Sequence, residues 1–76
     1  MNKKHQEKLR MLGLTIAYYR KLKGMTQIAL AEKVDISRTH ISNIEAPNGT
    51  TSVSLDTLFD IAEALEITVK DLFDFR

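Results

Sequence analysis

The chain has 76 residues, 43% of them hydrophobic and 28% charged, which suits one small globular domain and excludes a disordered tail. It contains no cysteine, which excludes disulfide bonds, thiolate zinc sites and cysteine nucleophiles. The apolar runs are only a few residues long, so we expect a cytoplasmic protein with neither a membrane span nor a signal-peptide core. The net charge of +1, taken as a total, favours no class of partner.

The charge is unevenly distributed along the chain. In residues 1–24, seven lysines and arginines accompany one glutamate, whereas residues 51–76 hold six acidic side chains and two basic ones. A basic end can attract a polyanion that it faces, but each charged run can equally be the solvated face of a helix. We expect residues 1–8 to form a basic N-terminal arm or an extension of the first helix, ahead of one domain over residues 9–76.

The first two segments with helical periodicity lie on either side of Gly24. Apolar side chains recur at spacings of three and four in the first segment, and Gly24 is a typical residue to end a helix. Thr26 is then a typical N-cap for a second helix of about two turns. The side chains that we expect to face the core are Leu9, Leu12, Ile16 and Tyr19 in the first helix, and Leu30, Ala31 and Val34 in the second.

Three further helices follow, each after a residue that caps helices. Ser37 precedes a third helix, Ser54 a fourth, and the Thr68-x-x-Asp71 pattern resembles a capping box that opens a short fifth. Pro47-Asn48-Gly49 indicates a loop between the third and the fourth. No segment alternates polar and apolar residues as a half-buried strand would. The inward side chains are expected to be Ile41 and Ile44, then Leu55, Leu58, Ile61, Ala62 and Leu65, and the short fifth helix holds Leu72 and Phe73.

Residues 26–46 have the pattern of a helix-turn-helix. Two short amphipathic segments are joined by about three residues, and the second segment of such a motif enters the DNA major groove. If Ile41 and Ile44 face inward, small and polar side chains face outward, and Arg38 can reach across that face. Arginine can pair with guanine, asparagine with adenine, and threonine can offer a hydroxyl or a methyl group. An ordinary solvated helix face would have a similar composition. The outward residues are Thr39, Ser42, Asn43 and Ala46.

The sequence as a whole resembles the phage repressor and Cro-like (XRE) family of helix-turn-helix domains. The matching residues are L-G-x-x-I-x-x-x-R-x-x-K-G-M-T-Q-x-x-L-A-E-K-V at 12–34, I-S-R-T-x-I-S-N-I-E at 36–45 and S-L-x-T-L-x-x-I-A-x-A-L at 54–65. The resemblance implies an all-α, five-helix, lambda-repressor-like domain. It also implies an internal salt bridge between Arg20 and Glu45, and a part-buried carboxylate does need such a partner.

The resemblance also assigns residues to DNA contacts. The base-reading positions correspond to Ser37, Arg38, Thr39 and Asn43. Contacts to the DNA backbone are expected from the start of the second helix, from the basic end of the first helix and from the third helix, at Thr26, Gln27, Lys21, Lys23, His40 and Ser42.

Two features depart from the family pattern. Asp35 occupies the turn position where the family usually has glycine, and aspartate tolerates the left-handed backbone better than most residues do. The loop before Ser54 is about two residues longer than usual and lacks the basic residue often found there. Any phosphate contact from this loop would therefore rely on backbone N–H and hydroxyl groups.

The sequence predicts a sequence-specific transcriptional regulator that reads a near-palindromic operator in double-stranded DNA through the major groove, as a homodimer. The alternative is a protein-interaction module of the same fold, such as an antitoxin or a regulatory adaptor. We expect neither enzyme activity nor a metal or other cofactor, because no residues have the spacing of metal ligands or of a nucleophile array. We expect no small-molecule effector domain, because 76 residues leave little room for one. The residues available for a dimer contact, if they do not fill the core, are Phe59, Leu72, Phe73 and Phe75.

Overall fold

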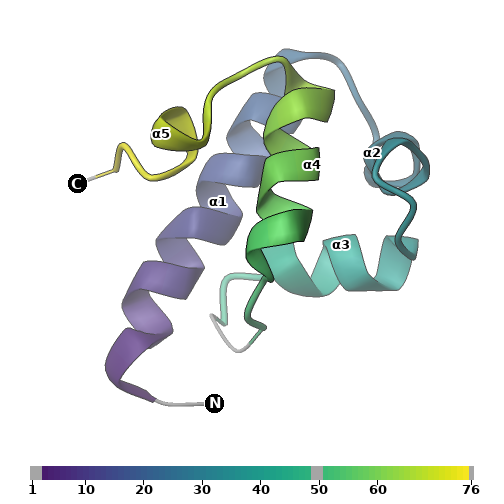
Figure 1. The fold of residues 1–76 in the computed structure, drawn as a ribbon. Coiled ribbons are helices and arrows are strands. Elements are labelled where there is room, and N and C mark those ends of the chain that lie inside the picture. The colour runs from purple at the N-terminus through teal and green to yellow at the C-terminus, as the bar shows by residue number, and fades with distance from the viewer. Residues whose placement is uncertain (1–2, 49–50, 76) are drawn as a thin grey trace.

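The computed structural model describes residues 3–48 and 51–75, and this part of the chain is helical without strands. Residues 1–2, 49–50 and 76 lie outside the described residues, among them Gly49 of the expected loop. The elements are η1 (Lys3–His5), a single 3-10 turn, and the helices α1 (Gln6–Leu22), α2 (Gln27–Lys33), α3 (Arg38–Glu45), α4 (Leu55–Leu65) and α5 (Val69–Leu72), arranged as in Figure 1.

Side-chain caps begin the last four helices, as predicted. The hydroxyl oxygens of Thr26, Ser37 and Ser54 each accept the backbone N–H three residues on, with N–O distances of 3.0, 3.0 and 3.2 Å. At α5 the capping box is complete, because the Asp71 carboxylate also accepts the backbone N–H of Thr68, at 3.0 Å. Each cap satisfies a backbone donor that the helix itself leaves free.

Left-handed residues end three of the helices or lie just beyond their ends. Gly24 after α1 has φ +72°, and Asp35 between α2 and α3 has φ +56°, so the turn retains the left-handed geometry without a glycine. Glu66 at the end of α4 has φ +59°, which the sequence pattern did not predict, because nothing about a glutamate signals this backbone conformation.

The first helix begins earlier than the apolar pattern indicates. It starts at Gln6 instead of Leu9, and the 3-10 turn precedes it, so the basic segment that begins with Lys3 is part of the helical body. The side chain of Gln6 also reaches across the fold, where its Nε2 donates to the carbonyl oxygen of Asn48 at 2.7 Å. This bond joins the start of α1 to the loop after α3.

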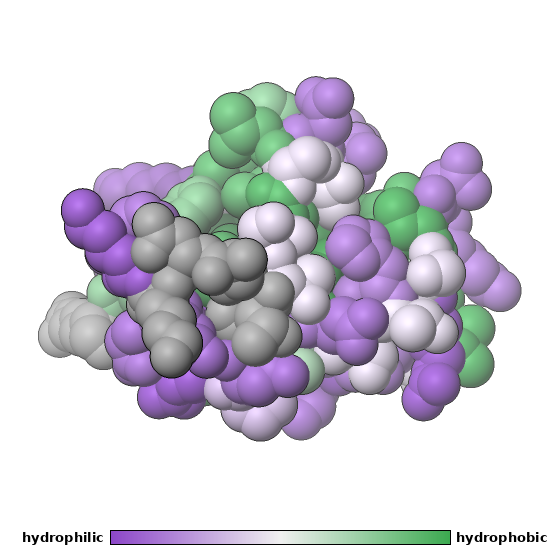
Figure 2. All heavy atoms as spheres, turned by 90° about the horizontal axis from the view of Figure 1, so that it is seen from below, coloured by the Kyte–Doolittle hydropathy of each residue, from purple (hydrophilic) through white to green (hydrophobic). Residues whose placement is uncertain are grey.

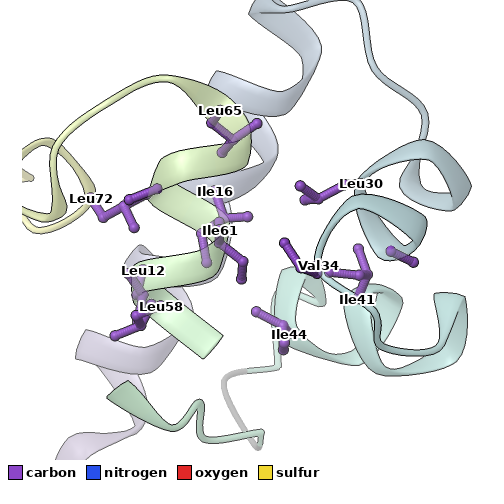
Figure 3. Close-up of a cluster of buried hydrophobic side chains, with 12 residues drawn as sticks. Leu12, Ile16, Leu30, Val34, Ile41, Ile44, Leu58, Ile61, Leu65 and Leu72 are labelled. Atoms are coloured by element: carbon purple, nitrogen blue, oxygen red, sulfur yellow. The ribbon is translucent and has the colours of Figure 1, made fainter. Parts of the chain in front are cut away.

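All five α-helices contribute to one core (Figure 3). α1 and α4 pack together, α5 covers one side of them, and α2 and α3 form a pair on the other side (Figure 1). The most buried side chains include Ile16, Leu30, Ile41, Ile61, Leu65 and Leu72.

The surroundings of Leu55 differ from the prediction, and those of Leu72 decide between the two roles that the sequence left open. Leu55 is 65% exposed, although it was expected to face inward. It is the first residue of α4 and lies about 60° around the helix from Leu58, at the edge of the apolar stripe. Leu72 is fully buried, so it fills the core of its own chain and is not available for contact with a second one.

Candidate nucleic-acid interface

The helix pair α2–α3 presents α3 at the surface of the molecule. The turn between the helices is closed by a backbone hydrogen bond from Ile36 N–H to the Ala31 carbonyl, at 3.0 Å, and by the left-handed Asp35. Ile41 and Ile44 are buried on the inner side of α3. The opposite side of α3 is therefore free to face a partner.

The outer face of α3 is polar and built from small side chains, with one arginine. Arg38, Thr39 and Asn43 are exposed, and His40 and Ser42 are half-buried beside them. Ser37 is also exposed, but its oxygen already accepts the N–H of His40 as the helix cap. Figure 2 views the molecule from below, the side on which α3 lies in Figure 1, and violet and white atoms predominate there.

A buried ion pair fixes α3 to the rest of the fold. The Arg20 guanidinium donates from Nε to Glu45 Oε2 at 2.7 Å and from Nη2 to Oε1 at 2.9 Å, and both side chains are less than 10% exposed. Arg20 Nη1 also donates to the carbonyl oxygen of Met25, at 2.7 Å. The structure thus brings together the pair that the resemblance implied, and a bidentate arginine–carboxylate pair has strict geometry. The pair ties the last residue of α3 to α1.

Gln27 also belongs to the hydrogen-bond network of Arg20 and Glu45. Its Nε2 donates to Glu45 Oε1 at 3.0 Å, so the first residue of α2 is also held to the last residue of α3. Gln27 remains half-exposed and borders a shallow groove between α1, α2 and α3. The other residues lining this groove are Leu14, Ala17, Arg20, Lys21, Ser42, Glu45, Ala46 and Pro47.

Gly13 lets α1 and α3 approach unusually closely. A Cβ atom at Gly13 would lie 2.1 Å from the carbonyl oxygen of Ile44 and 3.2 Å from its carbonyl carbon. Since both atoms belong to backbone, no side-chain rotation could relieve the overlap. Apolar periodicity alone does not predict this close approach, although an isolated glycine inside a helical pattern is itself a signal of close packing.

The two lysines at the end of α1 have different surroundings. Lys21 is exposed and borders the groove beside Gln27 and Ser42. Lys23 instead donates to the carboxylate of Glu66 at the end of α4, at the opposite end of the molecule from α3 (Figure 1). This hydrogen bond and the positive charge of Lys23 lower the pKa of Glu66 below its ordinary value. The pairing disfavours the expected DNA contact of Lys23.

The aromatic residues expected at a dimer contact lie on α4 and just after α5. Phe59 is 53% exposed and Phe73 is 48% exposed, while Phe75 is half-buried. The rings of Phe73 and Phe75 pack with centroids 6.4 Å apart. Phe59 and Phe73 are therefore left uncovered in the single chain.

A family model described as helix-turn-helix matches residues 16–72. The chain belongs to the helix-turn-helix family. The matched residues include the whole motif, the buried Arg20–Glu45 pair and the core of α4 and α5.

Two relatives within the helix-turn-helix family are regulators by name. Control protein C.BamHI of Bacillus amyloliquefaciens is 49% identical over 52 residues, which are 68% of this chain and 62% of that protein. The HTH-type transcriptional regulator SinR of Bacillus subtilis is 36% identical over 64 residues, which are 84% of this chain and 57% of SinR. The chain thus spans less than two thirds of the length of either relative.

Solved helix-turn-helix structures show the same fold. The restriction-modification controller protein C.AhdI from Aeromonas hydrophila has a TM-score of 0.80 and 30% identity, covering 87% of this chain and 97% of that one. SinR, the master regulator for biofilm formation, was solved in complex with DNA. It has a TM-score of 0.75 and 35% identity, and the match covers 83% of this chain and 98% of the SinR chain.

None of the helices within residues 3–48 and 51–75 is long and apolar enough to cross a membrane. The same residues contain no cluster of three or more histidine and acidic side chains that could hold a metal ion.

Proposed function

We propose that this chain is a DNA-binding transcriptional regulator that inserts α3 into the major groove of a specific duplex site. The observation that carries the proposal is the outer face of α3, where Arg38, Thr39 and Asn43 are exposed on a helix whose pose is fixed by the buried Arg20–Glu45 pair. A rigid helix with arginine and small polar side chains suits the edges of base pairs. The DNA complex of the similar SinR supports this choice of partner.

Phosphate contacts would set the register of α3 on the duplex. Lys21, Gln27 and Ser42 all border the groove beside α3, so a cation, an amide and a hydroxyl lie near one another there. Half or more of protein–DNA hydrogen bonds go to the backbone and carry no sequence information. His40, half-buried on α3, and the cap residue Thr26 are further candidates for backbone contacts in this proposal.

We further propose that the regulator acts as a homodimer through the side formed by α4 and the segment after α5. Phe59 and Phe73 are exposed there, and Phe75 packs beside Phe73. A two-fold axis through this side would place two copies of α3 about 34 Å apart, one turn of DNA, on a near-palindromic site. The acidic residues of α4 would then lie away from the phosphates.

The experiment is a selection of bound sequences from a random duplex pool, repeated with Arg38→Ala. The parent should enrich one near-palindromic motif. Arg38→Ala should bind that motif less tightly by about 1–3 kcal/mol and lose preference at one base position per half-site. Lys33→Ala is the matched control, because it removes one exposed positive charge at the far end of α2. Equal loss in both variants would mean that α3 does not read bases.

The alternative function, a protein-interaction module of the same fold, is favoured by the uncovered apolar side chains on α4. Leu55 and Phe59 are both more than half exposed on a helix that is otherwise acidic outside. If the parent enriches no motif at moderate salt, the regulator proposal fails and the interaction module replaces it.

A further inference from the structure

A second apolar stripe runs along α1 on the side away from the core. It consists of Met11, Leu14, Tyr18 and Leu22, at spacings of three, four and four residues. Leu14 is 39% exposed, Tyr18 59% and Leu22 67%, and Met11 is half-buried. We call this set the outer stripe of α1.

The outer stripe has the geometry of a helix-docking surface. At about 100° per residue, its four side chains fall within about 80° of arc and lie almost opposite the buried face of α1. It extends about 17 Å along the helix axis, at 1.5 Å per residue. Apolar side chains at such spacings are the anchors by which one amphipathic helix packs on another. An ordinary helix of a small soluble domain has only one apolar stripe.

The charges beside the outer stripe indicate which kind of helix could cover it. Lys8 and Lys21 are exposed on opposite sides of the stripe, each about 70° from its centre. Glu7 lies in line with the stripe one turn before Met11, but its carboxylate is paired with Arg10, with the closest N–O distance 3.4 Å. The rim is therefore basic. A partner helix with acidic residues beside its apolar face would complement it.

A second copy of this chain fits the outer stripe poorly. If two outer stripes packed together, Lys8 and Lys21 of both chains would border the same seam, and like charges along a helix seam are unfavourable. The chain's own acidic helix α4 is committed to the core through Leu58, Ile61 and Leu65. A separate acidic helix is the occupant that the charges favour.

We propose that the outer stripe of α1 is a docking surface for an acidic amphipathic helix of a partner protein, and that this partner competes with DNA. The competition with DNA rests on the proposed function. Leu14 belongs to the outer stripe and Lys21 to its rim, yet both also border the groove beside Gln27 and Ser42 where a phosphate would bind. Since a docked acidic helix would use the charge of Lys21, helix and phosphate would exclude each other.

The docking is tested without DNA, using a fluorescent synthetic peptide with leucines at helical spacings of three and four and glutamates between them. The expected result is saturable binding with amide shifts along the outer stripe, and weak binding of a scrambled peptide of equal composition. Tyr18→Ser with Leu22→Ser should weaken binding about tenfold, because both side chains would be anchors. Ile28→Ser is the matched control, since Ile28 is 53% exposed on α2, and it should change binding less than twofold.

Several outcomes would overturn the proposal. Equal binding of the scrambled peptide would mean charge attraction only, and shifts centred on Leu55 and Phe59 would place the surface on α4. Loss of self-association in the Tyr18→Ser, Leu22→Ser variant would mean that a second copy covers the stripe. Competition is then measured with the selected duplex: if peptide and DNA bind together, the competition fails while the docking stands. If no duplex is selected, the proposed function fails and the peptide result is unaffected.

Discussion

The sharpest prediction concerns Gly13, where α1 touches the backbone of α3. In Gly13→Ala, the new Cβ would lie 2.1 Å from the Ile44 carbonyl oxygen and 3.4 Å from the Cα of Glu45. An ordinary carbon–oxygen contact begins at about 3.3 Å, so the two helices must separate by about 1.2 Å. Every atom in the way is backbone, so the separation must move α3 itself.

The expected cost follows from two opposing effects. Overpacking in a close interface lowers the free energy of unfolding by about 1–3 kcal/mol. The loss for Gly13→Ala should lie near the upper value, because the atoms that the new Cβ meets belong to backbone. Alanine is better than glycine inside a helix by about 0.8–1.0 kcal/mol, which offsets part of the loss. We expect a net loss of about 2 kcal/mol, which corresponds to a fall in Tm of roughly 8–16 °C for a domain of this size.

The assay is thermal and urea unfolding followed by circular dichroism at 222 nm, with Gly24→Ala as the control. Gly24 has open space around an added Cβ, and only its φ of +72° opposes the change. Gly24→Ala should therefore lower the free energy of unfolding by about 1 kcal/mol. A Gly13→Ala variant as stable as the parent would refute the close contact. DNA affinity, measured below the unfolding range of both variants, should also fall because α3 is displaced.

Three other predictions test the core and the ion pairs. Glu45→Ala should lower the free energy of unfolding by about 3–5 kcal/mol in urea titration, because it leaves Arg20 charged and buried, and a loss below 1 kcal/mol would contradict this role. Leu72→Ala should lower the free energy of unfolding by about 2–5 kcal/mol in the same assay. If this loss is smaller at low protein concentration than at high protein concentration, Leu72 lies in an interface between chains instead of the core. NMR titration should give Glu66 a pKa below its ordinary value, and Lys23→Ala should raise it. Because the pKa of Glu66 is lowered in the folded state, the pair with Lys23 stabilises the fold at pH values above the pKa that Glu66 has in the unfolded chain. This contribution is lost as the pH falls through the pKa of Glu66 in the folded state. An unchanged Glu66 pKa in Lys23→Ala would refute the pairing.

Local chemistry predicted most of the helix starts. Thr26, Ser37, Ser54 and Thr68 act as caps because each has an extended backbone that brings its hydroxyl within reach of a free N–H three residues on. The caps depend on three or four consecutive residues, so the sequence contains all the information that they need. The left-handed turn at Asp35 was instead predicted from the resemblance to the family, which usually has glycine at that position.

Features that depend on distant partners were less predictable. Periodicity gave Leu55 a direction toward the core, but it gave no information on which element would cover that turn. The pairing of Lys23 with Glu66 joins residues 43 positions apart, and the Gln6 bond to Asn48 joins residues 42 apart. Such contacts exist only after the helices have packed. The Arg20–Glu45 pair was predicted because the family resemblance supplied the long-range information.

The buried network of Arg20, Glu45 and Gln27 has a consequence for redesign. It uses no side chain from the exposed face of α3, so the pose of the helix and the identity of its outer residues are set by separate parts of the chain. Arg38, Thr39 and Asn43 can therefore be exchanged with little effect on the position of the helix. New binding specificities can accordingly be sought by randomising these three positions on one constant scaffold.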